Sequence, residues 1–412
     1  MATIYPFRPI RPNPIYADQL VFTKPQAESV SGDYTKEGGL MPLKILLEAV
    51  ARQKPETPEG QAEAYQEIDE TLKTLLEREQ LWQENTDGIY IYEVTHTHYR
   101  QTGVWALSSL DDYRDGTIRI HELTFADSVR RLKNYRENTG LEGSPVLLTY
   151  LPDARINRII TETKLRPADE VFANQQGMHK LWKIEDEAVH QKLGDLFQRI
   201  GEVYLADGHH RMASACQLAQ EQQQQGLPVF DKISSLYMAT DQLRIEQYDR
   251  VVIPEAPADS EWLMRMLTPN FKIEKSENNQ PVIPAELHRI GMYHSGQWYQ
   301  LLVKTSIYSN KDLSSSLDAA ILQEQVLAPV FGITDPKTDS RLKCVGGEKA
   351  IEEINVIVGA HEHATVFMLC PLSIESLIAV ADAGQILPPK STWIVPKVPY
   401  GLLLHQHKIN SV

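Results

Sequence analysis

A short apolar run that leads directly into polar residues constrains the fold of this chain more than any other feature. Residues 203–206 have the composition of a buried β-strand. Five residues follow at once: Asp207, Gly208, His209, His210 and Arg211. A helix is expected from about residue 212 to the glutamine tract 222–225. The sequence therefore predicts a strand–turn–helix unit with a polar turn at the N-terminus of the helix.

A turn of this kind can bind an anion. The first N–H groups of a helix have no partner within the helix and lie at the positive end of its dipole, which favours phosphate. Gly208 lacks the Cβ that would keep a ligand away from the backbone. Arg211 can hold two phosphate oxygens, and His209 or His210 can donate a further bond. Asp207 can cap the helix or bind Mg²⁺. The alternative is an exposed polar turn in which Asp207 is only an N-cap.

Glu122 is a second candidate, because it follows His121 directly. A carboxylate beside a histidine can act as a general base that takes the proton of a substrate hydroxyl. In the alternative interpretation, Thr124 caps a helix that begins near Phe125, and Glu122 is a surface charge.

A third candidate is the turn at residues 385–392, which ends in a lysine and two hydroxyl side chains. Lys390 and Ser391 can bind an anion there. A rigid surface loop before a strand explains the same residues.

Charge and composition limit the partners. The chain has 41 Lys and Arg against 55 Asp and Glu, a formal charge of −14. This acidic balance argues against nucleic acid and anionic membranes as partners, and no run reaches the roughly 18 apolar residues of a membrane span. The three cysteines lie far apart, which fits a reducing compartment. We expect a cytoplasmic protein with a small-molecule substrate, and the oligomeric state stays open.

The rest of the chain mixes strand and helix patterns. Residues 88–94 and 102–107 are expected to form paired strands. The last third alternates expected strands with helices at 318–326 and 374–382, and one of these strands falls at 354–358. The motifs of the two commonest nucleotide-binding folds, G-x-G-x-x-G and Walker A, do not occur. The sequence predicts a mixed α/β (α+β) protein.

Taken in order along the chain, several segments resemble the bacterial and archaeal domain of unknown function 1015 (DUF1015) family nearly from end to end. They are residues 6–12, 112–116, 121–124, 144–146, 205–211, 248–252, 317–318 and 387–397. The family name by itself implies no activity.

A more distant resemblance does imply one. A His-Glu-x-Thr segment followed by Asp-Gly-His-His-Arg is similar to free serine kinases of the ParB/sulfiredoxin superfamily. The resemblance implies that Gly208, His209, His210 and Arg211 bind nucleotide phosphates. It implies that Glu122 is the catalytic base, with His210 beside the reacting phosphate. Asp207 would be a catalytic residue that either binds Mg²⁺ or lies beside the phosphates.

The chain departs from these relatives in three places. Residues 125–206 separate the two motifs, a longer interval than in the serine kinases, so the segment 164–200 is interpreted as an insertion or a lid. Residues 22–30 replace a Pro-Tyr-Asp-Val element of the family, which points to a changed substrate or a weaker activity. Residues 126–132 lack an expected Lys-Glu pair.

The resemblance implies a ParB/sulfiredoxin-like core elaborated by N-terminal and C-terminal α/β segments. We expect an N-terminal segment at 1–117, a nucleotide- and phosphate-binding core at 118–247 with the insertion 164–200, and a C-terminal α/β region at 248–412.

The leading functional hypothesis is a kinase that transfers phosphate from ATP or ADP, with Mg²⁺, to a small hydroxyl metabolite, serine first among them. One alternative is a phosphatase of a phosphorylated amino acid such as phosphoserine, which needs the same phosphate cradle with water as nucleophile. Another is a nucleotide-binding regulatory protein without fast turnover.

Overall fold

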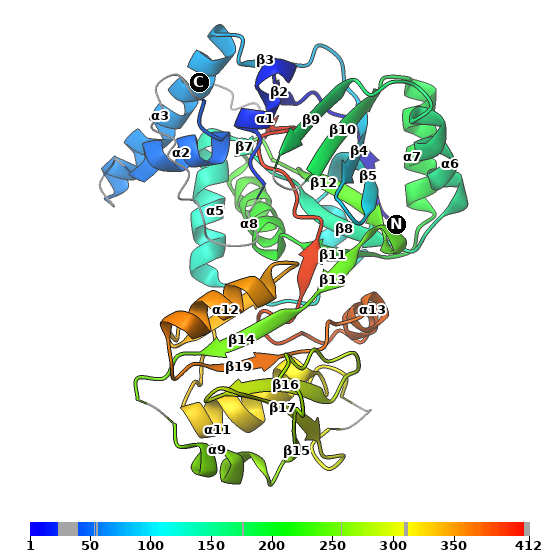
Figure 1. The fold of residues 1–412 in the computed structure, drawn as a ribbon. Coiled ribbons are helices and arrows are strands. Elements are labelled where there is room, and N and C mark those ends of the chain that lie inside the picture. Colours follow the sequence, from blue (N-terminus) through cyan, green and yellow to red (C-terminus); the bar gives the residue numbers. More distant parts are fainter. Residues whose placement is uncertain are drawn as a thin grey trace.

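The structure is a computed structural model that describes residues 1–23, 40–52, 54, 57–174, 177–256, 258–308 and 312–407. A larger lobe holds most of the first 240 residues, and a smaller lobe lies beneath it (Figure 1). Each lobe is built on its own β-sheet, and helices pack on the sheets. The prediction of a mixed α/β protein is confirmed.

The larger lobe contains a sheet of nine strands in the described part of the chain. Its main path runs through β6 (Ile118–Arg119), β11 (Val203–Asp207), β8 (Val146–Tyr150), β12 (Lys232–Ala239), β5 (Arg100–Ser109), β4 (Ile89–Thr95), β10 (Gly177–Ile184) and β9 (Glu170–Asn174), and β1 (Ile4–Tyr5) also pairs with β5. The pairs β11–β6 and β12–β8 are parallel, and the others are antiparallel. The expected pairing of residues 88–94 with 102–107 is the antiparallel pair β4–β5.

Both faces of this sheet are buried. Successive side chains of a strand point to opposite faces, so neighbouring residues of β4 belong to two different cores. Ile89 and Ile91 pack in one core with residues of three helices, α6 (Ala154–Thr163), α7 (Glu187–Gln198) and α8 (His209–Gln225). Tyr90 and Tyr92 pack in a second core on the opposite face. That core includes Leu377 of α13 (Ile374–Asp382), so the C-terminal part of the chain covers the larger sheet.

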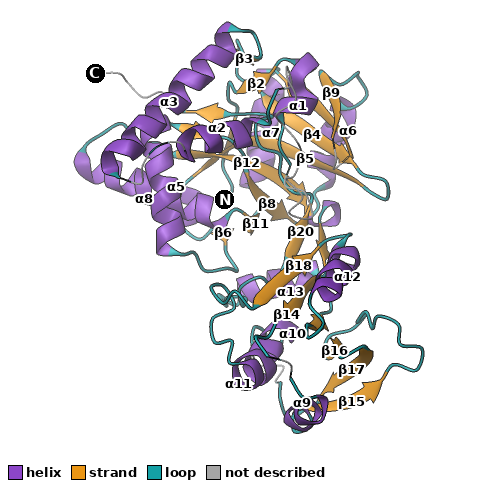
Figure 2. Ribbon diagram, turned by 60° about the vertical axis from the view of Figure 1, so that its left-hand side comes forward, coloured by secondary structure: helices purple, strands orange, loops and turns teal. Residues whose placement is uncertain are grey.

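Further helices and small strand pairs surround the larger sheet. The helices are η1 (Pro14–Tyr16), α1 (Ala17–Leu20), α2 (Leu43–Arg52), α3 (Pro58–Glu77), α4 (Asp111–Arg114), α5 (Ala126–Thr139) and η2 (Thr240–Gln242). Three small antiparallel pairs are β2 (Ile10–Pro12) with β3 (Leu81–Gln83), β7 (Leu141–Glu142) with β21 (His405–Gln406), and β13 (Arg244–Glu246) with β20 (Trp393–Val395). Figure 2 shows β20 between the two lobes.

The smaller lobe contains a six-stranded antiparallel sheet in its described residues. Its order is β15 (Phe271–Lys275), β17 (Gln297–Val303), β16 (Arg289–His294), β19 (Thr365–Met368), β14 (Tyr248–Val252) and β18 (Leu342–Gly346). One face packs against α9 (Ser260–Leu267), α10 (Asp318–Leu322), a π-helical turn (Gln323–Leu327) and α11 (Ala328–Phe331). The other packs against α12 (Ala350–Ala360).

The strand expected at 354–358 is wrong, because these residues belong to α12. The apolar run contains both faces of a helix. Ile354 and Ile357 are buried at helical spacing, whereas Val356 is 72% exposed. A short apolar run does not distinguish a strand from a buried helix, and here the packing against β14 and β18 selected the helix.

The expected domain boundaries stay predictions. The nine-stranded sheet takes strands from both sides of residue 117, and β9, β10 and α7 lie within the expected insertion 164–200. β10 pairs with β4 along its whole length, which makes this segment part of the sheet. Residue 248 begins β14, the first strand of the smaller sheet along the chain.

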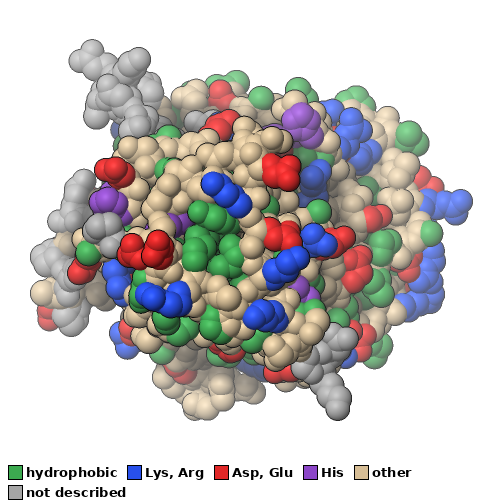
Figure 3. Space-filling model, turned by 60° about the horizontal axis from the view of Figure 1, so that its bottom comes forward, with side chains coloured by type: hydrophobic (Ala, Val, Ile, Leu, Met, Phe, Trp, Pro, Cys, Tyr) green, Lys and Arg blue, Asp and Glu red, His purple; other side chains and the backbone are tan. Residues whose placement is uncertain are grey.

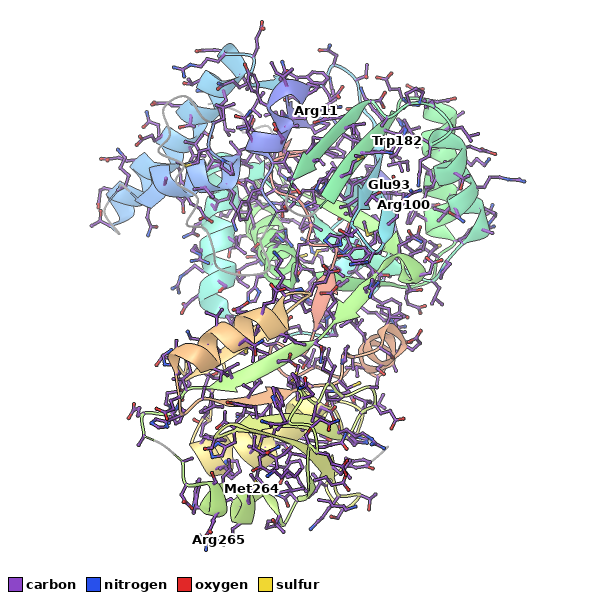
Figure 4. All side chains as sticks on the ribbon, viewed as in Figure 1. Arg11, Glu93, Arg100, Trp182, Met264 and Arg265 are labelled. Atoms are coloured by element: carbon purple, nitrogen blue, oxygen red, sulfur yellow. The ribbon has the colours of Figure 1, made fainter. Side chains whose placement is uncertain are left out.

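Buried ion pairs hold the N-terminal segment against the larger lobe. Arg11 donates to Glu84 at 2.7 Å and to Glu170 at 2.6 Å, and all three side chains are at most 6% exposed. Figure 4 shows Arg11 near the top of this lobe. A second group labelled there contains Glu93, which lies 2.5 Å from Lys164 Nζ and 3.9 Å from Arg100 Nε.

Among the described residues, none of the helices combines the length and apolar character needed to cross a bilayer. Figure 3 views the end of the molecule that lies at the bottom of Figure 1. Acidic and basic side chains are interspersed there around a small group of apolar side chains.

Candidate functional site

The predicted strand–turn–helix unit is confirmed, and the helix starts three residues earlier than expected. β11 ends at Asp207, and α8 begins at His209. β11 is held on both sides, by β8 and by β6. Its pairing with β8 shifts register between Leu205 and Asp207, which is the geometry of a β-bulge. The bulge lies immediately before the turn.

Gly208 is the N-cap residue of α8, so the expectation that Asp207 caps this helix is wrong. Gly208 has φ +97°, in the left-handed region that glycine adopts without strain. A Cβ here would lie 2.9 Å from Arg211 Nε and 3.0 Å from Val146 Cγ1. No described side chain caps the helix, so its first N–H groups are left to a ligand or to solvent.

Arg211 connects the turn to the neighbouring strand segment. Its Nη2 atom donates to Asp207 Oδ2 at 2.8 Å, and its Nη1 atom donates to Ser144 Oγ just before β8. The guanidinium is therefore held in a defined orientation at the start of α8. The side chain of Arg211 remains 27% exposed.

Glu122 lies beside a buried pair of histidines. Its Oε2 atom is 3.9 Å from Nδ1 of His209, which the structure leaves only 5% exposed. The rings of His209 and His121 meet edge to face, with centroids 4.5 Å apart. Burial lowers the pKa of His209 to about 3, so the imidazole is neutral at physiological pH. Burial also lowers the pKa of His121.

The carboxyl group of Glu122 has a raised pKa. Burial is the main cause, and the negative charge of Asp207 adds to it. The positive charges of Lys390, Lys337 and Lys397 act in the opposite direction. A carboxylate with a raised pKa is a stronger base than an exposed glutamate.

His210 points to a different neighbour. Its Nε2 atom accepts a hydrogen bond of 3.1 Å from the N–H of Phe125. Burial and nearby Lys337 and Lys390 lower its pKa. In a neutral imidazole whose Nε2 accepts, the proton is on Nδ1, which is then a donor. Phe125 is itself the N-cap residue of α5, so the alternative in which Thr124 caps this helix is wrong.

One cavity of about 660 Å³ collects most of the predicted residues. This volume is in the range of ligand pockets, roughly 300–1,000 Å³. The predicted residues in its lining are Glu122, Asp207, Gly208, His209, His210, Arg211 and Lys390. Residues from α5, the end of β11 and the segment 390–400 meet here, although they are far apart in the sequence.

The cavity is basic although the chain is acidic. Six of its lining residues are cationic: Lys44, Arg131, Arg136, Arg211, Lys390 and Lys397. Three are acidic: Glu122, Glu142 and Asp207. With the histidines neutral, the balance is 6 − 3 = +3, against −14 for the whole chain. Such a local reversal of charge favours an anionic ligand.

Lys390 and Ser391, the two candidates of the turn at residues 385–392, lie in different surroundings. Lys390 lines the cavity and adopts φ +62°, while its carbonyl accepts from Arg250 at 2.8 Å. Ser391 does not line this cavity: its hydroxyl donates to the Pro388 carbonyl at 2.7 Å, and it borders a much smaller pocket. The next residue, Thr392, lines the cavity again.

Sequence reasoning missed several cationic residues of the cavity. Arg131 comes from α5, where Ser128, Leu132 and Tyr135 share its face at helical spacing. The spacing indicates that these side chains share one face of α5. It does not reveal which part of the protein that face contacts. Of the divergent segment 22–30, Phe22 lines the cavity, and residues 24–30 lie outside the described residues.

The donors for a metal ion are limited to carboxylates. Within the described ranges, no group of three or more His, Cys, Asp and Glu residues has the arrangement of a metal site. Asp207 and Glu122 both line the cavity. Mg²⁺ is commonly bound by one or two carboxylates together with substrate phosphates and water, so Asp207 alone would be enough on the protein side for magnesium bound with a nucleotide.

The family assignment comes from a comparison with family models. The model described as protein of unknown function (DUF1015) matches residues 4–320, and the chain belongs to this family. A comparison with curated proteins finds no match.

Three solved structures resemble the fold at low identity. A free serine kinase mutant in complex with AMP is 12% identical, with coverage of 74% of this chain and 91% of its own and a TM-score of 0.40. SbnI with a C-terminal truncation from Staphylococcus aureus is 14% identical, with 73% and 82% coverage and a TM-score of 0.35. A conserved hypothetical protein from Pyrococcus furiosus is 12% identical, with 74% and 95% coverage and a TM-score of 0.36.

Proposed function

We propose that this protein is a phosphotransferase that uses ATP or ADP to phosphorylate a small hydroxyl metabolite, with serine as the leading acceptor. The observation that carries the proposal is the position of Glu122. Its carboxyl group, with a raised pKa, lines the same basic cavity as the uncapped N-terminus of α8 and Arg211. A base and a phosphate cradle in one cavity are the two parts that phosphoryl transfer to an alcohol requires.

The phosphate cradle consists of backbone and side-chain donors. The first N–H groups of α8 bind oxygens of the transferring phosphate at the positive end of the helix dipole. Arg211 adds a planar pair of donors, held by Ser144 and Asp207. His210 adds its Nδ1–H group, and Lys390 adds a positive charge.

Glu122 acts as the base. It takes the proton of the acceptor hydroxyl while the hydroxyl oxygen forms a bond to phosphorus. The bond from phosphorus to the bridging oxygen breaks, and the product nucleotide leaves as ADP from ATP or as AMP from ADP. Asp207 would hold Mg²⁺, which neutralises phosphate charge.

Phosphorus NMR tests the function directly. The purified protein is incubated with Mg²⁺ and serine, separately with ATP and with ADP, and a third sample contains only phosphoserine and Mg²⁺. A phosphoserine signal in either of the first two samples is the expected result, and it identifies the donor. Free phosphate from phosphoserine alone would support the phosphatase instead. Three unchanged spectra would contradict serine as acceptor and favour a nucleotide-binding regulatory protein.

The pH dependence of the rate tests the role of Glu122. A base works in its ionised form, so kcat/KM should fall as the pH drops through the raised pKa of Glu122, above the ordinary value of 4.5. Lys337 lowers this pKa but does not line the cavity. The variant Lys337→Met should therefore shift the acidic limb of the profile to higher pH and leave the plateau unchanged.

The matched control for this measurement is Lys192→Met, which removes an exposed lysine of α7 in the opposite part of the lobe. Its profile should superimpose on that of the unmodified protein. An acidic limb that stays in place in Lys337→Met, or moves to lower pH, would show that a group other than Glu122 controls the rate.

A further inference from the structure

The cavity has two chemically different ends. At one end lie the N-terminus of α8 and its cationic neighbours. The other end is lined by Phe22, Tyr135, Leu141 and Tyr400, with Lys44 beside them. We call this group the aromatic end. Tyr135, Leu141 and Tyr400 belong to one apolar cluster with α2 and α3, so their positions are supported from behind.

A two-residue segment joins the ends. Ser144 accepts a hydrogen bond from Arg211 at the phosphate cradle. Its neighbour Gly143 lies against the ring of Tyr400, where a Cβ would overlap the ring carbons, and its carbonyl accepts from Gly401 at 2.8 Å. The ring of Tyr400 thus contacts Gly143, and the next residue, Ser144, orients Arg211. The glycine is required for this close approach.

Backbone pairing brings together two of the three rings of the aromatic end. Phe22 and Tyr400 form an antiparallel bridge, with N···O distances of 2.9 and 2.7 Å. Lys44 Nζ lies 4.9 Å from the centroid of the Phe22 ring. Both rings are half-buried and line the cavity.

We propose that the aromatic end binds the nucleobase of the nucleotide whose phosphates lie at α8. This inference rests on the proposed function and specifies where its donor binds. A cavity that is cationic at one end and aromatic at the other matches a ligand with phosphates on one side and a flat ring on the other. Nucleobases stack on aromatic side chains whatever their identity, so the site selects a nucleotide over inorganic phosphate without base-specific hydrogen bonds.

Trp393 is the most buried aromatic residue of the cavity lining. Trp393 is 8% exposed, and Lys397 Nζ lies 4.3 Å from its ring centroid. Tyr248 contacts the same ring edge-on at 5.3 Å. The low exposure of Trp393 favours the half-buried rings of Phe22 and Tyr400 as the base site.

Binding titrations with matched ligand pairs test the proposal. ATP is compared with inorganic tripolyphosphate, and ADP with pyrophosphate, all with Mg²⁺. Tyr400→Leu should weaken the nucleotide by about 10-fold or more, from the loss of a stacked ring, and leave the inorganic partner unchanged. Arg211→Ala should weaken both members of each pair. The control is Tyr65→Leu, a half-buried tyrosine of the same apolar cluster that does not line the cavity.

The outcomes separate this inference from the function. If Tyr400→Leu behaves like Tyr65→Leu in both titrations, or weakens nucleotide and inorganic partner equally, the base binds elsewhere and the inference fails. If the nucleotide titrations depend on Tyr400 but phosphorus NMR detects no transfer to serine, the base site stands and the proposed kinase function fails. Absence of nucleotide binding by the unmodified protein would overturn both.

Discussion

Replacing Arg211 with alanine is expected to lower kcat/KM for phosphoryl transfer by about 10³-fold. The guanidinium is oriented by Ser144 and Asp207 at the start of α8, and in the proposed mechanism it neutralises charge that develops on the transferring phosphate. Its removal also leaves Asp207 without its 2.8 Å partner, so a negative charge faces the phosphates. Steady-state kinetics with saturating acceptor measures the effect.

Two further variants make this result specific. Arg211→Lys keeps the charge but loses the planar pair of donors, and it should recover only part of the rate. Arg158→Ala removes an arginine of α6 that is 77% exposed, and its rate should be unchanged. A rate for Arg211→Ala near that of the unmodified protein would remove the turn from the mechanism.

Replacing Arg11 with alanine is expected to lower the free energy of unfolding by about 3–5 kcal/mol. Arg11 is 3% exposed and lies between Glu84 and Glu170, so its loss leaves two buried carboxylates without their main cation. Lys183 Nζ, at 2.9 Å from Glu84, compensates only one of them. Urea unfolding followed by circular dichroism measures the change in midpoint.

Arg8→Ala is the control, because Arg8 pairs with Asp87 at 2.9 Å while both side chains are 54% exposed. An exposed pair contributes at most about 1 kcal/mol. Equal losses in Arg8→Ala and Arg11→Ala would show that the burial of the ion pairs does not determine their contribution.

The candidate turn could be predicted because its signals are local. An apolar strand, a glycine and a helix pattern follow one another within a few residues, and backbone geometry alone then produces free N–H groups beside Arg211. The alternative in which Asp207 caps the helix is wrong for a local reason too. Gly208 takes the cap position with positive φ, which the residue type permits but does not require.

The remaining parts of the site required long-range contacts. Glu122 reaches the turn through the parallel pairing of β6 with β11, whereas Lys390 and Tyr400 join the cavity only after the C-terminal segment has folded back over the larger sheet. The direction of a side chain can sometimes be inferred from its neighbours, but its partner cannot. Lys390 and Ser391 are adjacent, and the sequence made both of them candidates for anion binding. The path of the backbone placed only Lys390 in the cavity.

By itself, the sequence determined the mixed α/β class, the strand–turn–helix unit and the candidate residues for phosphate binding, because periodicity, glycine and charge act over a few residues. Only the tertiary structure decided that 354–358 is a helix, that an acidic chain encloses a basic cavity, and that this cavity extends to Phe22 and Tyr400. The physical reason is that burial and electrostatic environment depend on residues far apart in the chain, and these meet only when the sheets and their covering segments pack.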